Sequence, residues 1–218
     1  MTLLCLADIH GEAAGLEELL SGSAHPDAVI VAGDITHLGG REEAQRVLAP
    51  ILASGVRVLA VAGNMDRDPA RGYLGELGID LHSRGIVIDE IGFMGLGGGT
   101  PSPFGTPWEL GDEEAERCLA AGLSQIERAL FKVLVSHPPP RGTDLDRSFA
   151  HLHVGSAAVR KFLDAGRANL CICGHIHESA GEQSVGGALC VNLGPFKNGN
   201  YALVRIEGGQ ANVTRRMR

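Results

Sequence analysis

Short apolar runs recur in the first third of the chain, and each run ends in glycine or in polar residues. Because nearly every position within a run is apolar, the pattern is typical of strands that are buried on both faces. The segments between the runs place apolar residues three and four positions apart, which predicts helices. We expect strands over residues 2–7, 28–32 and 56–62, and helices over 12–20 and 41–54. This alternation indicates parallel strands with helices packed on their faces.

The remainder of the chain continues the pattern with longer interruptions. Segments 95–107 and 141–154 are rich in glycine, proline or polar residues and are predicted to be loops. Further helices are expected from Asp68, over 112–130 and over 156–163, with Asp68, Asp112 and Ser156 as their caps. Further strands are expected as a pair within 86–94, over 131–135 and 170–173, and as a terminal meander over 189–192, 201–206 and 210–214.

The composition fits one globular domain spanning residues 1–218, since 44% of the residues are hydrophobic and 21% are charged. The formal net charge of −7 argues against a general affinity for nucleic-acid backbones, so no stable nucleic-acid partner is expected. The chain begins directly with a predicted strand, and no apolar run approaches the length that spans a membrane. We therefore expect neither a signal peptide nor membrane insertion.

The cysteines indicate a reducing environment. Their number is five, which is odd, and most of them lie in apolar, strand-like runs. This favours buried thiols in a cytoplasmic protein over a disulfide framework. A zinc site on Cys171 and Cys173 is disfavoured, because no second cysteine pair would complete a tetrahedron.

Residue types that bind metals follow successive predicted strands. They are Asp8, His10, Asp34, Asn64, His137, His175 and His177. In sheets of parallel strands, ligands bind at the carboxyl ends of the strands. Taken alone, Asp8 and Asp34 could cap helices and Asn64 could shape a turn. Their joint occurrence at one strand end after another favours a metal site.

The ligand types suggest which ions would bind. Two carboxylates, one amide and four imidazoles suit Mn²⁺, Fe, Zn²⁺ or Ni²⁺ better than Mg²⁺, and manganese is favoured. Seven ligands are too many for one ion, whereas a carboxylate that bridges two ions would use them fully. Two-metal sites hold their ions about 3.5–4 Å apart and promote in-line displacement at phosphorus. Two divalent ions, two aspartates and a bridging hydroxide would leave a net positive charge, which attracts a phosphate.

These motifs, in this order, resemble the signature of calcineurin-like metallophosphoesterases. The matching residues are Asp8-x-His10, Gly33-Asp34, Gly63-Asn64-x-Asp66, His137 and Gly174-His175-x-His177. The segments around Ser136 to Pro140, His153 to Ser156 and Gly174 to Glu178 are also similar to a small, single-domain prokaryotic branch of this family.

The resemblance implies an α/β fold, a four-layer αββα sandwich in which two mixed sheets are flanked by helices. It places the metal site at the carboxyl ends of the strands, with Asp34 bridging two ions. The implied ligands of one ion are Asp8, His10, Asp34 and His177, and those of the other are Asp34, Asn64, His137 and His175.

One position departs from the family pattern. Many members carry histidine directly after the asparagine, where this chain has Met65. That histidine is usually assigned to the leaving group or to a phosphate oxygen, and a thioether can replace it in neither role. Asp66, which orients the family's histidine, is then expected to be structural. Two other residues are candidates near the substrate: His153, as a proton donor or phosphate contact or else a loop-packing residue, and Arg141, as a phosphate contact or an exposed charge.

The predicted function is a phosphodiesterase that hydrolyses a small phosphodiester by attack of a metal-bridging hydroxide. The metals, Asn64 and His175 would stabilise the developing charge. One alternative is a non-catalytic metal-binding scaffold on the same fold, although this chain keeps all seven ligands. Another is a phosphomonoesterase or protein phosphatase, which Met65 disfavours. The expected partner is a small phosphoester substrate, the physiological substrate stays open, and a dimer is one of the open oligomeric states.

Overall fold

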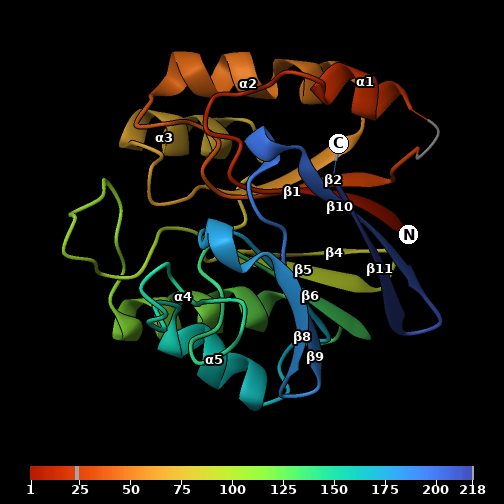
Figure 1. Ribbon diagram of the computed structural model, residues 1–218. Helices are drawn as coiled ribbons and strands as arrows, with labels where there is room; N and C mark the ends of the chain where they lie inside the picture. The colour runs from red at the N-terminus through yellow and green to blue at the C-terminus, as the bar shows by residue number, and fades with distance from the viewer. Residues whose placement is uncertain (23–24, 218) are drawn as a thin grey trace.

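Two β-sheets lie face to face in the computed structural model, which describes residues 1–22 and 25–217 (Figure 1). The first sheet has the strand order β11 (Gln210–Met217), β10 (Asn200–Glu207), β1 (Thr2–Leu6), β2 (Ala28–Ala32) and β3 (Arg57–Val61). The second has the order β4 (Gly85–Ile88), β5 (Ile91–Leu96), β6 (Phe131–Ser136), β7 (Leu170–Cys173), β9 (Ala188–Asn192) and β8 (Gly181–Val185).

Both sheets are mixed. Strands β1, β2 and β3 run parallel, as the alternation of strands and helices predicts. In the second sheet β5, β6, β7 and β9 run parallel, while β4 and β8 add antiparallel edges. β10 joins β1 in antiparallel pairing and β11 follows it, so the two ends of the chain share the first sheet.

Helices cover the outer face of each sheet, which gives four layers (Figure 1). Helices α1 (Leu16–Ser21), α2 (Arg41–Ala53) and α3 (Asp68–Glu76) pack on the first sheet. Helices α4 (Asp112–Gln125) and α5 (Ala157–Asp164) pack on the second, and short 3-10 helices lie at His177–Ser179 (η1) and Phe196–Asn198 (η2). The predicted αββα sandwich is therefore confirmed. Among the described residues, none of the helices is long and apolar enough to cross a membrane.

Alternation along the strands explains the layers. In β2, Ala28, Ile30 and Ala32 face the other sheet, whereas Val29 and Val31 face the helices, and all five are buried. Since successive side chains of a strand point to opposite faces, an uninterrupted apolar run fits only a strand covered on both sides. Burial of each valine or isoleucine side chain contributes about 1.5–3 kcal/mol.

Several predicted boundaries differ from the observed ones for local reasons. The helix expected from residue 12 begins at Leu16, because Gly11 and Gly15 both adopt positive φ angles that a helix does not accommodate. The helix expected to reach residue 130 ends at Gln125, where the backbone of Ile126 leaves helical geometry. Ser156 caps its helix through Val159 N–H, as expected.

The other predicted caps are wrong. Asp68 and Asp112 are the first residues of their helices and make no capping hydrogen bond with their side chains.

The predicted terminal meander is also wrong. β9 belongs to the second sheet, parallel to β7, whereas β10 and β11 belong to the first. The segment between β9 and β10 crosses from one sheet to the other, and Phe196 N–H donates to the Ala7 carbonyl at the end of β1. β8 was not predicted, because its sequence Gly181–Val185 is mostly polar, as suits an edge strand with one exposed face.

The parallel strands of both sheets end at the same side of the molecule. The loop after β5, yellow-green in Figure 1, projects from this side. The predicted loop at 95–107 is shorter at its start, since β5 includes Gly95 and Leu96. All five cysteines are free, and Cys118 alone among them is not fully buried.

Candidate metal centre

Several residues in the turns that follow the strands adopt strained backbone conformations. Asp8, His10, Asp34 and His175 have φ angles of 51°, 49°, 49° and 70°, in the left-handed region that L-residues seldom occupy. Each such residue costs about 1–3 kcal/mol, and such strain clusters at functional sites.

The first half of the centre joins β1, β2 and the segment after β7. Nε2 of His177 lies 3.4 Å from Oδ1 of Asp8 and 3.2 Å from Nε2 of His10. Nε2 of His10 lies 3.7 Å from Oδ2 of Asp34. The ligand atoms of Asp8, His10 and His177 all lie within 4.8 Å of one another, which is close enough to share one ion.

The second half joins β2, β3, β6 and the same segment after β7. Nε2 of His137 lies 3.4 Å from Oδ1 of Asp34 and 2.9 Å from Oδ1 of Asn64. The rings of His137 and His175 have centroids 4.8 Å apart. Asp8, Asp34 and His137 form a second group whose ligand atoms lie within 4.8 Å of one another.

Asp34 lies between the two halves. Its Oδ2 faces His10 and its Oδ1 faces His137, so its two oxygens point to different sets of imidazoles. Two glycines leave room for these side chains: a side chain at Gly63 would collide with Asp34, and one at Gly33 would collide with the His137 ring. These glycines explain why the two motifs contain Gly33-Asp34 and Gly63-Asn64.

Backbone groups orient the imidazoles. Nδ1 of His137 donates to the Ala32 carbonyl at 2.9 Å, which directs Nε2 toward Asp34 and Asn64. The backbone N–H of His175 donates to the Asp8 carboxylate. A partner on the ring, such as the Ala32 carbonyl for His137, fixes the tautomer and direction of a histidine. The N–H of His175 instead holds the carboxylate of Asp8 in place.

Asp66 connects the two central loops and does not enter the centre. Its fully buried carboxylate accepts hydrogen bonds from the N–H groups of Ile35, Thr36 and Gly63 and from the Thr36 hydroxyl. The loop that carries Asp34 and the loop that carries Asn64 are thereby tied together. This is the structural role expected for Asp66 when methionine replaces the family's histidine.

The buried charges shift the pKa values of the centre. Burial opposes protonation of His137, but the adjacent Asp34 carboxylate outweighs it and raises the pKa of His137 to about 9. For Asp34, burial raises the pKa, and the pairing with His137 and His10 outweighs burial and lowers it. Burial lowers the pKa of His175 to about 4 and also lowers the pKa of His10. In the metal-free centre these two rings are neutral and present free lone pairs.

The donors present fit divalent ions. Nε2 atoms of His10 and His177 face each other at 3.2 Å, an arrangement that a shared cation satisfies well. Nδ1 of His10 is a buried atom with no hydrogen-bond partner among the described residues. The mix of carboxylate, amide and imidazole donors suits first-row transition metals. All seven residues predicted to bind metal thus lie together at this end of the sheets. Their ligand atoms cluster as Asp8, His10 and His177 and as Asp8, Asp34 and His137, so the division into the two sets that the resemblance implies stays a prediction.

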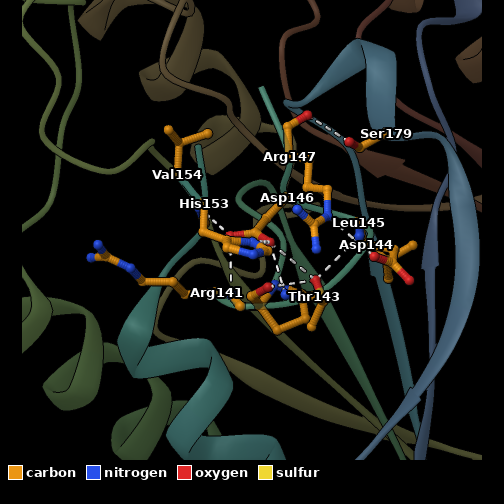
Figure 2. Close-up of polar contacts among 12 residues, drawn as sticks. Arg141, Thr143, Asp144, Leu145, Asp146, Arg147, His153, Val154 and Ser179 are labelled. Carbon is orange, nitrogen blue, oxygen red and sulfur yellow. Dashed lines mark hydrogen bonds and ion pairs between the residues drawn. The ribbon is translucent and has the colours of Figure 1, made fainter. Parts of the chain in front are cut away.

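The other predicted site residues lie farther out. Met65 is half-buried beside Asn64, and its backbone N–H donates to Oδ1 of Asp34 at 2.9 Å. His153 lies in the loop after β6 and contacts Asp146. Arg141 is exposed, and its side chain extends away from that contact (Figure 2).

Two residues near the centre were missed by sequence reasoning. The ring of exposed His37 meets the His10 ring edge-on, with centroids 5.4 Å apart. The ammonium of Lys197, on η2, is close enough to help lower the pKa of His10. His37 follows Asp34 by three positions, which was the available signal, whereas nothing in the sequence around Lys197 indicated its location.

Comparison with known proteins shows the family to which this chain belongs. The family profile of the calcineurin-like phosphoesterases matches residues 1–179. An uncharacterized protein of Methanocaldococcus jannaschii, MJ1162, is 33% identical over 202 residues, which cover 89% of this chain and 88% of that protein. The chain therefore belongs to the calcineurin-like phosphoesterase family.

Solved structures agree with this fold. The TT1561 protein of Thermus thermophilus superposes with a TM-score of 0.77 at 18% identity, over 98% of this chain and 97% of that one. A dimetal phosphatase from Danio rerio superposes with a TM-score of 0.74 at 16% identity, over 100% of this chain and 96% of that one. At these identities the likeness concerns the fold.

Proposed function

We propose that this protein is a dinuclear metal-dependent phosphodiesterase that hydrolyses a small phosphodiester. The observation that carries the proposal is the position of Asp34, whose two carboxylate oxygens face His10 on one side and His137 on the other. The proposed ligands of the first ion are Asp8, His10, Asp34 and His177, and those of the second are Asp34, Asn64, His137 and His175. Manganese is the favoured metal, and the free thiols suit a reducing compartment such as the cytoplasm.

Two divalent ions, when bound, supply positive charge that polarises a phosphoryl group and activates water for in-line attack. The protein's own groups then position the ester. Asn64 and His175 line the second half of the centre, where a side-chain amide and an imidazole can donate to phosphoryl oxygens as negative charge develops. Lys197 and His37 add polar groups at the rim on the side of His10.

Met65 supports a diester as the substrate. The thioether cannot donate a proton or balance charge, so the centre lacks one cationic side chain at this position. A monoester dianion brings one more negative charge than a diester and needs that cation more. A centre with methionine here is therefore better suited to the diester.

The test is hydrolysis of paired mono- and diesters by metal-stripped protein that is reloaded with one metal at a time. We expect no turnover after chelation, recovery with Mn²⁺, and a higher kcat/KM for the diester of each pair. Undiminished turnover in exhaustively chelated protein would contradict a metal mechanism. A preference for monoesters would leave the metal centre standing and replace the diesterase with a phosphomonoesterase. Binding of two metals without turnover of any ester would favour a scaffold.

A further inference from the structure

The loop between β6 and α5 contains a buried carboxylate that no part of the metal centre uses. Asp146 has a fully buried side chain, and its carboxylate accepts hydrogen bonds from the backbone N–H groups of Gly142, Thr143 and Gly155 at 2.9–3.1 Å. Nδ1 of His153 lies 2.7 Å from Oδ1 of the same carboxylate. Figure 2 shows these contacts converging on Asp146, with the His153 ring against it.

The contacts define the charge of Asp146 and the hydrogen-bonding role of Nδ1 of His153. Hydrogen bonds from His153 and from the backbone outweigh the raising effect of burial and lower the pKa of Asp146, so the carboxylate is ionised. An ionised carboxylate only accepts hydrogen bonds, and Nδ1 of His153 must therefore carry a proton. Nε2 is left on the opposite side of the ring with no partner among the described residues, on a side chain that is 34% exposed.

Hydrogen bonds from Asn192 connect this loop to the segment that carries His175 and His177. The buried amide of Asn192 donates to the carbonyl of Leu145, next to Asp146, at 3.0 Å, and to the carbonyl of Ile176, between the two histidines after β7, at 2.9 Å. Leu145 and Ile176 are thus held by the same nitrogen atom. The residue before His177 and the residue before Asp146 are therefore neighbours.

Two further contacts place the other end of the loop beside Asn64. The Thr100 hydroxyl donates to the Val154 carbonyl at 2.9 Å, and the neighbouring Gly99 packs so closely on Asn64 that a side chain at this glycine would meet it. At the base of the loop, Ser156 N–H donates to the Pro139 carbonyl, two residues after His137. The loop that carries His153 is therefore joined to the segments that carry Asn64, His137 and His177.

We propose that His153 donates the proton to the leaving oxygen of the phosphodiester, and that Asp146 is its positioning residue. The inference rests on the proposed phosphodiesterase function and provides the acid that Met65 cannot supply. A histidine held by a carboxylate through Nδ1 presents Nε2 in a fixed direction, the arrangement by which proteins orient catalytic imidazoles.

The proposed step balances in protons and electrons. A bond forms between phosphorus and the oxygen of the attacking water, and one proton of that water passes to solvent. The ester bond from phosphorus to the leaving oxygen breaks, and its electron pair stays on that oxygen. The leaving oxygen takes the proton from Nε2 of His153. The ring becomes neutral while Nδ1–H stays bound to Asp146, and solvent returns a proton to Nε2.

The experiment compares aryl methyl phosphodiesters that differ only in the leaving group, from acidic 4-nitrophenol to the less acidic phenol. Protonation matters most for the poor leaving group. For His153→Gln we expect kcat/KM to fall by about 10²-fold or more for the phenyl ester and by less than about 3-fold for the nitrophenyl ester. The matched control is His151→Asn, an exposed histidine of the same loop with a positive φ that asparagine tolerates. We expect it to behave as wild type with both esters.

Asp146 is tested by Asp146→Asn and nitrogen NMR of the His153 ring. We expect a loss on the phenyl ester smaller than for His153→Gln, and a ring whose neutral form no longer carries its proton mainly on Nδ1. Because this variant disturbs a buried network, an independent test is rescue of His153→Ala by free imidazole, which we expect for the phenyl ester alone.

Specific results would overturn the proposal while leaving the phosphodiesterase in place. These are equal losses on the two esters in His153→Gln, no loss on either ester, or no rescue by imidazole. Failure of the wild-type protein to hydrolyse either ester would instead contradict the proposed function itself.

Discussion

Asp34 is the residue on which the two halves of the metal centre depend. It adopts a positive φ angle, is almost fully buried, and faces His10 with one oxygen and His137 with the other. No other carboxylate among the described residues has imidazoles facing both of its oxygens in this way. Replacement of a residue that contacts both halves should therefore affect the centre more than replacement of a residue that contacts one half.

Asp34→Ala should therefore be the most damaging single change in the centre. Loss of this carboxylate removes a ligand from both ions and leaves two cations uncompensated at short range. We expect loss of both metal equivalents and of nearly all activity, measured by elemental analysis and diester hydrolysis. His177→Ala, which touches only the first half, should retain more of the second metal. Two equivalents of metal and near-native activity in Asp34→Ala would show that Asp34 does not bridge.

Met65→His should change the choice of substrate. The position is half-buried beside Asn64, with its backbone N–H on Asp34, so a new imidazole can face the substrate. Acid assistance is typically worth about 10²–10⁴-fold, and the added cation helps the dianion more. We expect kcat/KM for nitrophenyl monoesters to rise relative to the matching diesters. An unchanged ratio in the variant would show that Met65 does not determine selectivity.

At the scale of elements, the loops after β2 and β3 act as one unit because Asp66 joins them. Four hydrogen bonds from three residues end on this carboxylate. The backbone groups involved belong to Ile35, Thr36 and Gly63, next to the positions that carry the ligands. Asp66 thus acts on the metal centre through the backbone.

Asp66→Ala should weaken both the fold and the metal centre. Each buried donor left unpaired costs about 1–3 kcal/mol, so we expect a loss of about 3 kcal/mol or more in the free energy of unfolding, measured with denaturant. Metal affinity should fall about 10- to 100-fold, as for other supporting residues of metal sites. Asp68→Ala is the control, since Asp68 is exposed and its ion pair among the described residues is with Arg71, three positions along the same helix. A similar small effect for both variants would show that Asp66 does not support the loops.

At the scale of the molecule, the centre exists only because the two sheets pack together. The first sheet supplies Asp8, His10, Asp34 and Asn64 through the loops after β1, β2 and β3, and the second supplies the three other histidines. The apolar faces of both sheets form the common core beneath. Metal binding is therefore expected to depend on the packing of the two sheets. It is also expected to depend on the charged side chains that the two sheets bring close together.

Metal binding should release protons near neutral pH. The pKa of His137 in the metal-free protein is raised to about 9, so at pH 7.5 the ring carries a proton that a metal must displace. The apparent affinity should rise with pH up to about 9, by about tenfold per unit if one proton is released. Calorimetry in buffers of different ionisation enthalpy measures that proton. Binding enthalpies that do not depend on the buffer would contradict the raised pKa of His137.

Much of the fold and the set of candidate metal-binding residues followed from local sequence pattern, because each candidate comes shortly after a strand that is recognisable by its own apolar residues. Asp8, Asp34 and His137 needed no knowledge of distant partners to be singled out. The tertiary structure decided what depends on neighbours far apart in sequence. β9 pairs within the second sheet and not in the expected meander. The edge strand β8 is mostly polar, so no apolar pattern indicated it. Lys197 lies close enough to His10 to affect its pKa, although the two residues are far apart in sequence. The pairing of His153 with Asp146 was likewise decided by a loop that folds back on itself, since neither residue lies on a strand or helix whose period would place it.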